Sequence, residues 1–196
     1  MMLAPAFDDP PLASQAVFRT VMEGMARPAL WRPLSVELCP PPPITPTAAA
    51  VALTLLDYET PFWLDAPLAA DGAVAAWLAF HTGARLAADA ASASFAFISD
   101  PAAMPSFDAF SQGSLEYPDR SATLVLQVAS FPEDASLTFS GPGIPGSRRF
   151  SATPLPVDFR ARLVANRDKF PLGVDLIFVS GDAAAALPRS IRVKGS

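Results

Sequence analysis

The feature that most constrains the fold of this chain is the alternation of helix-like and strand-like apolar patterns along its whole length. Apolar side chains recur at helical spacing in four segments, 14–26, 48–57, 71–83 and 156–168. Short apolar runs typical of buried strands occupy 61–64, 94–99, 123–128, 137–140 and 174–179. Interleaved helices and strands predict one three-layer α/β domain over residues 1–196, with a mixed β-sheet flanked by helices.

Local signals set the expected boundaries of these elements. Ser14 and Thr47 are candidate N-caps for the first two helices, and residues 1–13 are expected to form an extended N-terminal arm. Pro28 should end the first helix, and Gly83 has the left-handed preference that ends the third. Five prolines stiffen residues 40–46, which we interpret as a connector within the domain.

Two further segments near the end of the chain complete the expected fold. Residues 141–146, Gly-Pro-Gly-Ile-Pro-Gly, are predicted to form a turn. Residues 187–193 are predicted to close the sheet as its last strand.

The set of reactive side chains is small. The chain has one histidine, His81, one cysteine, Cys39, and two lysines among its 196 residues. A single imidazole excludes sites that need two histidines, and a single cysteine excludes an internal disulfide and cysteine-based zinc clusters. Neither lysine lies in an apolar run of the kind that supports Schiff-base chemistry. We therefore predict no cofactor or metal site.

Charge and hydropathy restrict the partners. The net charge of −5 disfavours nucleic acid as a ligand. Hydrophobic residues make up 51% of the chain, but no run reaches the roughly 20 apolar residues of a membrane span, and the N-terminus lacks a signal-peptide pattern. We therefore expect a cytoplasmic protein that buries part of its apolar excess against another subunit.

Five charged or titratable side chains are candidate binding residues for a ligand: Arg19, Asp57, His81, Asp175 and Arg189. Asp175 interrupts an apolar strand, so its carboxylate needs either a cation, Arg189 or Arg19, or a ligand. Arg19 could equally reach an acidic partner subunit.

Other polar residues leave two interpretations open. His81 ends an amphipathic helix, where it is either a capping or core residue, or a general acid-base or anion-binding group. The neighbouring Arg148 and Arg149 are either solvated arginines on a strand edge or a clamp for phosphate or phosphonate oxygens.

The chain resembles the PhnH family, the H subunits of the bacterial carbon-phosphorus (C-P) lyase system that degrades phosphonates. Single residues that carry the resemblance are Phe18, Arg19, Met25 and Pro28. Longer stretches that carry it are 55–57, 60–61, 80–82, 122–124, 127–130, 137–138, 141–144, 170–176 and 187–190. Two departures are Ala29, where the family pattern usually has glycine, and the proline-rich stretch at 40–46.

The resemblance implies a fold like the large domain of pyridoxal-phosphate transferases, without the cofactor. It also implies a homodimer that joins PhnG, PhnI and PhnJ in a core complex. With PhnG, PhnI and PhnL, the family is associated with transfer of the ribose triphosphate of ATP to a phosphonate. The resemblance implies that a ligand of the candidate binding residues would be a phosphonate or a nucleotide, and it assigns no catalytic residue. The alternative is that the chain is itself a transferase or hydrolase for a phosphorylated ligand, using His81 with Asp57 and Asp175.

Overall fold

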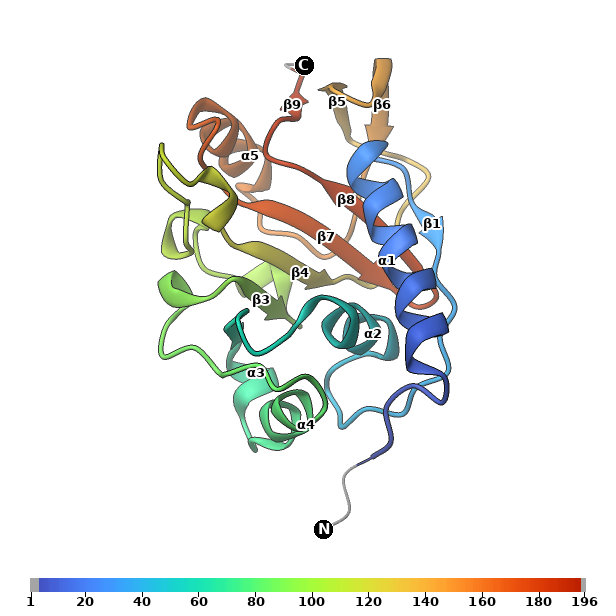
Figure 1. Ribbon diagram of the computed structural model, residues 1–196. Coiled ribbons are helices and arrows are strands. Elements are labelled where there is room, and N and C mark those ends of the chain that lie inside the picture. The colour runs from blue at the N-terminus through green and yellow to red at the C-terminus, as the bar shows by residue number, and fades with distance from the viewer. Residues whose placement is uncertain (1–3, 195–196) are drawn as a thin grey trace.

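A mixed six-stranded sheet forms the centre of the computed structural model, which describes residues 4–194 (Figure 1). The strand order is β1-β8-β7-β4-β3-β2. Four strands run parallel to one another: β2 (Phe62–Leu64), β3 (Phe95–Ile98), β4 (Thr123–Gln127) and β7 (Asp175–Ser180). β8 (Ala183–Leu187) pairs antiparallel with β7, and β1 (Arg32–Pro33) pairs antiparallel with β8. The predicted mixed α/β sheet is therefore confirmed.

A second, three-stranded sheet has the order β6-β5-β9 and packs at one end of the molecule. Its strands are β5 (Leu137–Gly141), β6 (Ile144–Phe150) and β9 (Arg192–Val193). The α-helices are α1 (Pro10–Ala26), α2 (Pro46–Leu55), α3 (Ala66–Ala69), α4 (Ala73–Thr82) and α5 (Phe159–Asp168). Single-turn 3-10 helices span Ala90–Ser92, Pro101–Ala103, Phe107–Ala109 and Pro118–Arg120.

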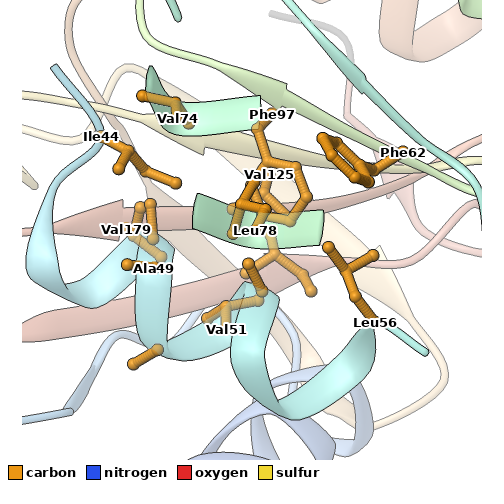
Figure 2. Close-up of a cluster of buried hydrophobic side chains, with 14 of the residues drawn as sticks. Ile44, Ala49, Val51, Leu56, Phe62, Val74, Leu78, Phe97, Val125 and Val179 are labelled. Atoms are coloured by element: carbon orange, nitrogen blue, oxygen red, sulfur yellow. The ribbon is translucent and has the colours of Figure 1, made fainter. Parts of the chain in front are cut away.

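Side chains of the central strands alternate between two cores because successive residues of a strand point to opposite faces of the sheet. Val125 and Val179 face the first core, beneath α2 and α4, where Ala49, Val51 and Leu78 meet them (Figure 2). The neighbours of these valines on each strand, such as Leu124, Leu126 and Phe178, face the second core.

The two faces of the sheet are covered differently. α1, α2 and α4 cover the first face, as a three-layer domain requires. The second face packs against α5, the second sheet and aromatic residues of the chain between β3 and β4, among them Phe107 and Phe110. The prediction of helices on both sides is thus only partly right, since one outer layer is mostly irregular chain and small-sheet residues.

α1 lies close to β8, and small residues make the close approach possible. A Cβ atom added at Gly24 would be 3.4 Å from the Cβ of Ala186. At the end of α1, Ala29 has a left-handed φ of 61° and donates its amide to the carbonyl oxygen of Ala186, 3.0 Å away. Alanine therefore adopts, at this position, a backbone conformation that glycine adopts more readily.

The helix starts differ from those predicted because other side chains act as caps. Asp9 accepts from the amide of Leu12, so α1 begins at Pro10 and Ser14 lies inside it. The predicted extended arm is correspondingly shorter than 1–13, and its residues 1–3 lie outside the described residues. Thr45, rather than Thr47, caps α2, and the Thr47 hydroxyl donates to the carbonyl oxygen of Gly181.

Other helix boundaries also differ from those predicted from the sequence. Pro46 is the first residue of α2, so the proline-rich connector ends one residue earlier than the predicted 40–46. α4 begins at Ala73 instead of Asp71, α5 at Phe159 instead of Pro156, and the short α3 was not predicted. Gly83 ends α4 with a φ of 72°, as expected.

The C-terminal strands required the largest correction. Residues 187–193 do not form the last strand of the central sheet, because Arg192 and Val193 pair with β5 of the second sheet. The run that extends the central sheet is β8, and its alanines carry no strong strand signal. The predicted turn at 141–146 is tighter than expected, since β6 already begins at Ile144.

Within residues 4–194, no helix is both long enough and apolar enough to cross a membrane.

Candidate functional site

Asp175 and Arg189 form the ion pair that the sequence favours. Asp175 opens β7, and Arg189 follows β8, the next strand of the sheet. Asp175 Oδ1 accepts from the backbone amide of Arg189 at 2.8 Å and from its Nε at 3.2 Å, and Oδ2 accepts from Nε at 3.2 Å and from Nη2. The two side chains retain only 18% and 15% of their exposure. Of the partners that the sequence left open for Asp175, the structure supplies Arg189.

The remaining side of the Arg189 guanidinium is also occupied. Nη1 donates to the carbonyl oxygen of Pro118 at 2.6 Å, and this bond ties the chain before β4 to the end of β8. A shallow hollow of about 360 Å³ lies over the pair, lined also by Asp119, Phe170 and Ser190. The pair thus serves first as a crosslink of the fold, because both groups already have partners.

The position of this pair in the sheet differs from the usual position of ligands. Ligands of α/β sheets bind at the carboxyl ends of parallel strands. Asp175 stands at the amino end of β7, and Asp57 precedes β2, also on the amino side. β3 and β4 separate β2 from β7, which puts three strand spacings, about 14 Å, between the starts of those two strands. The two carboxylates therefore do not form one acid-base pair.

Asp57 stabilises the turn between α2 and β2. Its carboxylate accepts from the amide of Glu59 at 2.9 Å and from the hydroxyl of Thr60 at 3.0 Å. Its own amide hydrogen is donated to the Thr60 hydroxyl oxygen at 2.7 Å. This is the bonding pattern of an aspartate that holds a tight turn.

His81 anchors the N-terminal segment. Its Nε2 lies 3.0 Å from the carbonyl oxygen of Ala4, and the Nε1 of Trp77 donates to the same oxygen at 2.8 Å. The imidazole ring also packs edge-on against Trp77 and Phe80. These contacts favour the structural interpretation of His81 over the acid-base one.

Arg19 lies on the exposed face of α1, away from Asp175. It shares a surface hollow with Phe18, Met22 and Glu23. Leu12, Phe18 and Met22 remain 65%, 49% and 50% exposed on this helix. Together with Arg19 we call these residues the α1 face. An exposed apolar row with a central arginine is typical of a contact surface between proteins.

Asp65 is a buried carboxylate that the sequence-based selection of site residues missed. It follows β2 directly, at the carboxyl end of the strand, and is 6% exposed. It accepts from the amides of Ser99 and Asp100 at 2.7 and 2.9 Å, and it caps α3 through Leu68 at 3.3 Å. Its signal was its place between an apolar strand and Ala66-Pro67, which is typical of a helix start.

The arginine pair of β6 bonds to backbone carbonyls. Arg148 Nη1 donates to the carbonyl oxygen of Pro28 at 2.6 Å, and Arg149 donates through Nε and Nη2 to that of Ala135 at 2.9 and 2.5 Å. Both line a hollow of about 280 Å³ beside Trp31. Residues on an edge strand therefore fasten the second sheet to the segments around it.

Metal ligands and lysines add little to the site. Among residues 4–194, no three histidine, cysteine, aspartate or glutamate side chains gather as a metal site. Lys169 forms an ion pair with Asp108 on the surface.

Fold and site together define an α/β protein with a mixed six-stranded sheet, a small second sheet, and charged side chains at strand ends that bond to one another. The chain belongs to the PhnH family. The family model described as "Bacterial phosphonate metabolism protein (PhnH)" matches residues 5–194.

Two related proteins are similar to this chain in sequence. The "Alpha-D-ribose 1-methylphosphonate 5-triphosphate synthase subunit PhnH" of Rhizobium meliloti (strain 1021) is 40% identical over 189 residues, which cover 96% of this chain and 94% of the relative. HtxG of Stutzerimonas stutzeri, a proposed C-P lyase subunit protein, is 40% identical over 86 residues, 43% of this chain and 44% of the relative.

Proposed function

We propose that this protein is an accessory subunit of a C-P lyase complex in phosphonate catabolism. It acts with PhnG, PhnI and PhnL in the transfer of the ribose triphosphate of ATP to an alkylphosphonate, and it forms a homodimer within a core that contains PhnG, PhnI and PhnJ. The name of the Rhizobium meliloti relative, a subunit of a triphosphate synthase, supports this proposal.

The observation that carries the proposal is that the charged candidate residues already bond within the chain, whereas apolar side chains of α1 are exposed to solvent. Asp57, His81 and Asp175 all have structural partners. On the α1 face, in contrast, Leu12, Phe18 and Met22 are about half exposed or more. Apolar side chains gathered on one helix stabilise a complex when a partner covers them.

Reconstitution of the complex tests the proposal. The core subunits are combined with and without this chain, and the conversion of ATP and methylphosphonate is followed. We expect conversion only when the chain is present, and co-elution of the chain with PhnG, PhnI and PhnJ. Normal assembly and turnover without it would refute the proposed role.

Substitutions on the α1 face test whether it is the contact surface. Phe18→Asp combined with Met22→Asp should keep the fold, because both side chains are exposed, yet should lose co-elution or the homodimer as measured by light scattering. Tyr58→Asp combined with Leu115→Asp is the matched control, since these side chains are 72% and 79% exposed and lie outside α1. Unchanged assembly of the double variant would exclude the α1 face as the contact surface.

The competing proposal is that the chain itself acts on a phosphorylated ligand through His81 and the carboxylates Asp57 and Asp175. It predicts turnover by the isolated chain that His81→Ala abolishes. The distance between the starts of β2 and β7, and the partners of the three side chains, support the accessory role instead.

We also propose that the fold of this chain is like the large domain of pyridoxal-phosphate transferases, but without the cofactor. The ion pair of Lys169 with Asp108 on the surface supports a protein that binds no aldehyde cofactor there. We expect the purified protein to be colourless, with no aldimine absorption, and to reside in the cytoplasm.

A further inference from the structure

A hollow between the second sheet and α5 has the features of a small-molecule site. It measures about 420 Å³, within the range of ligand pockets in proteins. It lies on the second face of the central sheet, apart from the Asp175–Arg189 pair and from the α1 face.

The floor of the hollow is aromatic and rigid. Phe139, Phe150 and Phe159 line it and are 1%, 6% and 4% exposed. Phe150 and Phe159 both pack on Phe178 of β7, with ring centroids 5.5 and 6.2 Å apart. Because these rings belong to the core, the hollow is already formed without a ligand. Binding therefore costs little conformational entropy.

Hydroxyl groups converge on one side of this floor. Ser136 Oγ and Ser151 Oγ lie 3.0 Å apart, and both residues line the hollow. One hydroxyl hydrogen is used in their mutual bond, so the other hydroxyl hydrogen remains available to an acceptor.

A cation lies at the rim. Arg160, the second residue of α5, lines the hollow, and its Nη2 is 3.4 Å from the carbonyl oxygen of Lys194. Among residues 4–194, no carboxylate lies within 4.0 Å of this guanidinium, whereas Arg162 and Arg189 are ion-paired. Its charge is available for a ligand anion.

We propose that this hollow binds a small oxyanion with an apolar or aromatic body, such as an aromatic carboxylate or phosphonate. The body packs on the phenylalanine floor, and the anionic oxygens accept from Arg160 and from the free serine hydroxyl. The proposal does not depend on the role of the chain in a complex, because it concerns the isolated protein.

Saturation-transfer NMR and calorimetric titration of the full chain test the proposal with four probes. Benzoate and phenylphosphonate carry both the body and the charge, benzyl alcohol carries only the body, and inorganic phosphate only the charge. We expect binding of one or both aromatic anions, with the comparison of benzoate and phenylphosphonate identifying the preferred head group. Equal or stronger binding of inorganic phosphate or benzyl alcohol would overturn the proposal, as would no binding of either aromatic anion at millimolar concentration.

Variants locate the site. Arg160→Ala should weaken binding of the aromatic anion by about tenfold, as expected for loss of a charge-assisted bond. Ser136→Phe, at an exposed position, should fill the hollow and abolish binding. Arg85→Ala is the control, since Arg85 is also exposed and lies outside the hollow. Binding that survives both site variants, in proteins with unchanged melting temperature, would place the ligand elsewhere.

Discussion

At the scale of single residues, several partly buried charged groups of this protein bond to one another or to backbone atoms. Asp175 and Arg189 illustrate this, since every carboxylate oxygen and three guanidinium nitrogens have partners. Removing the charge of one partner would leave the other charge alone in an environment with little water, which is strongly unfavourable. The pair therefore makes a testable contribution to stability.

Asp175→Asn should lower the free energy of unfolding by about 2–4 kcal/mol, because it leaves the Arg189 charge with no anionic partner in a mostly buried site. Urea denaturation measures the effect. Asp158→Asn is the control: Asp158 is 54% exposed in its pair with Arg162, so its loss should cost less than about 1 kcal/mol. Equal effects of the two substitutions would contradict the structural role of Asp175.

His81→Ala should lower the free energy of unfolding by about 1 kcal/mol, the value of one hydrogen bond, and loosen the segment around Ala4. Hydrogen exchange of the N-terminal amides measures the second effect. Turnover of the reconstituted complex should stay unchanged. Lost turnover at unchanged stability would favour a catalytic histidine and count against our proposal.

At the scale of helices and strands, close approach of backbones holds the parts together. Gly143, in the turn between β5 and β6, has a φ of 77°, and a Cβ atom there would be 2.1 Å from the carbonyl oxygen of Ala26. The turn thus packs directly on the end of α1. Gly146 has nearly the same φ, 70°, but nothing within 4 Å of its Cβ position.

Gly143→Ala should therefore destabilise the protein more than Gly146→Ala. The second substitution costs about 1 kcal/mol for the left-handed backbone alone. The first substitution adds a clash between the new Cβ atom and a backbone carbonyl, which cannot move aside as a side chain could. Its cost should exceed that of the second by about 2 kcal/mol or more. Thermal unfolding of both variants gives the difference. Similar costs would show that α1 and the turn move apart easily.

Apolar periodicity predicted the central elements but not their edges. The strands around Val125 and Ile177 were predictable because they are buried on both faces and almost continuously apolar. β8 was missed because four alanines resemble a helix, whereas in the structure their backbone pairs with β7 and Ala186 packs beneath Gly24 of α1. β6 was missed because Pro145 and Gly146 indicate a turn.

The site residues were predictable to a similar degree. The need of Asp175 for a cation follows from its place in an apolar strand, and the structure supplies Arg189. The partner of His81 could not be predicted, because no local pattern connects it with Ala4, which is 77 residues away. The phenylalanine-floored hollow is lined by residues of one stretch, 132–160, but its walls depend on the pairing of β6 with β5, and apolar periodicity did not predict β6.

At the scale of the whole molecule, the two cores share one sheet. Neighbouring residues of each central strand, such as Val125 and Leu126, belong to different cores. Loss of either core would expose one face of every central strand. The two cores should therefore form and melt together as one domain.

A single cooperative transition is the expected result when the protein is unfolded with urea. Far-ultraviolet circular dichroism follows the helices, most of which lie on the first face. Fluorescence of Trp63 follows the second core, because this ring packs on Phe110 with ring centroids 5.6 Å apart. The substitutions Trp31→Phe and Trp77→Phe remove the fluorescence of the other two tryptophans. Coincident midpoints are expected, and separate transitions would show two independent units.

The short outer strands of the central sheet determine how a neighbour can recognise this protein. One edge is β1, only two residues long, and Pro33 has no amide hydrogen to donate. The other is β2, three residues long, where the amide and carbonyl of Phe62 are already bonded to Arg85 and Ala87. An incoming strand would find almost no free backbone ladder to extend. A partner that contacts this sheet must therefore recognise side chains, so its affinity should depend on the residues at the contact more than on backbone pairing.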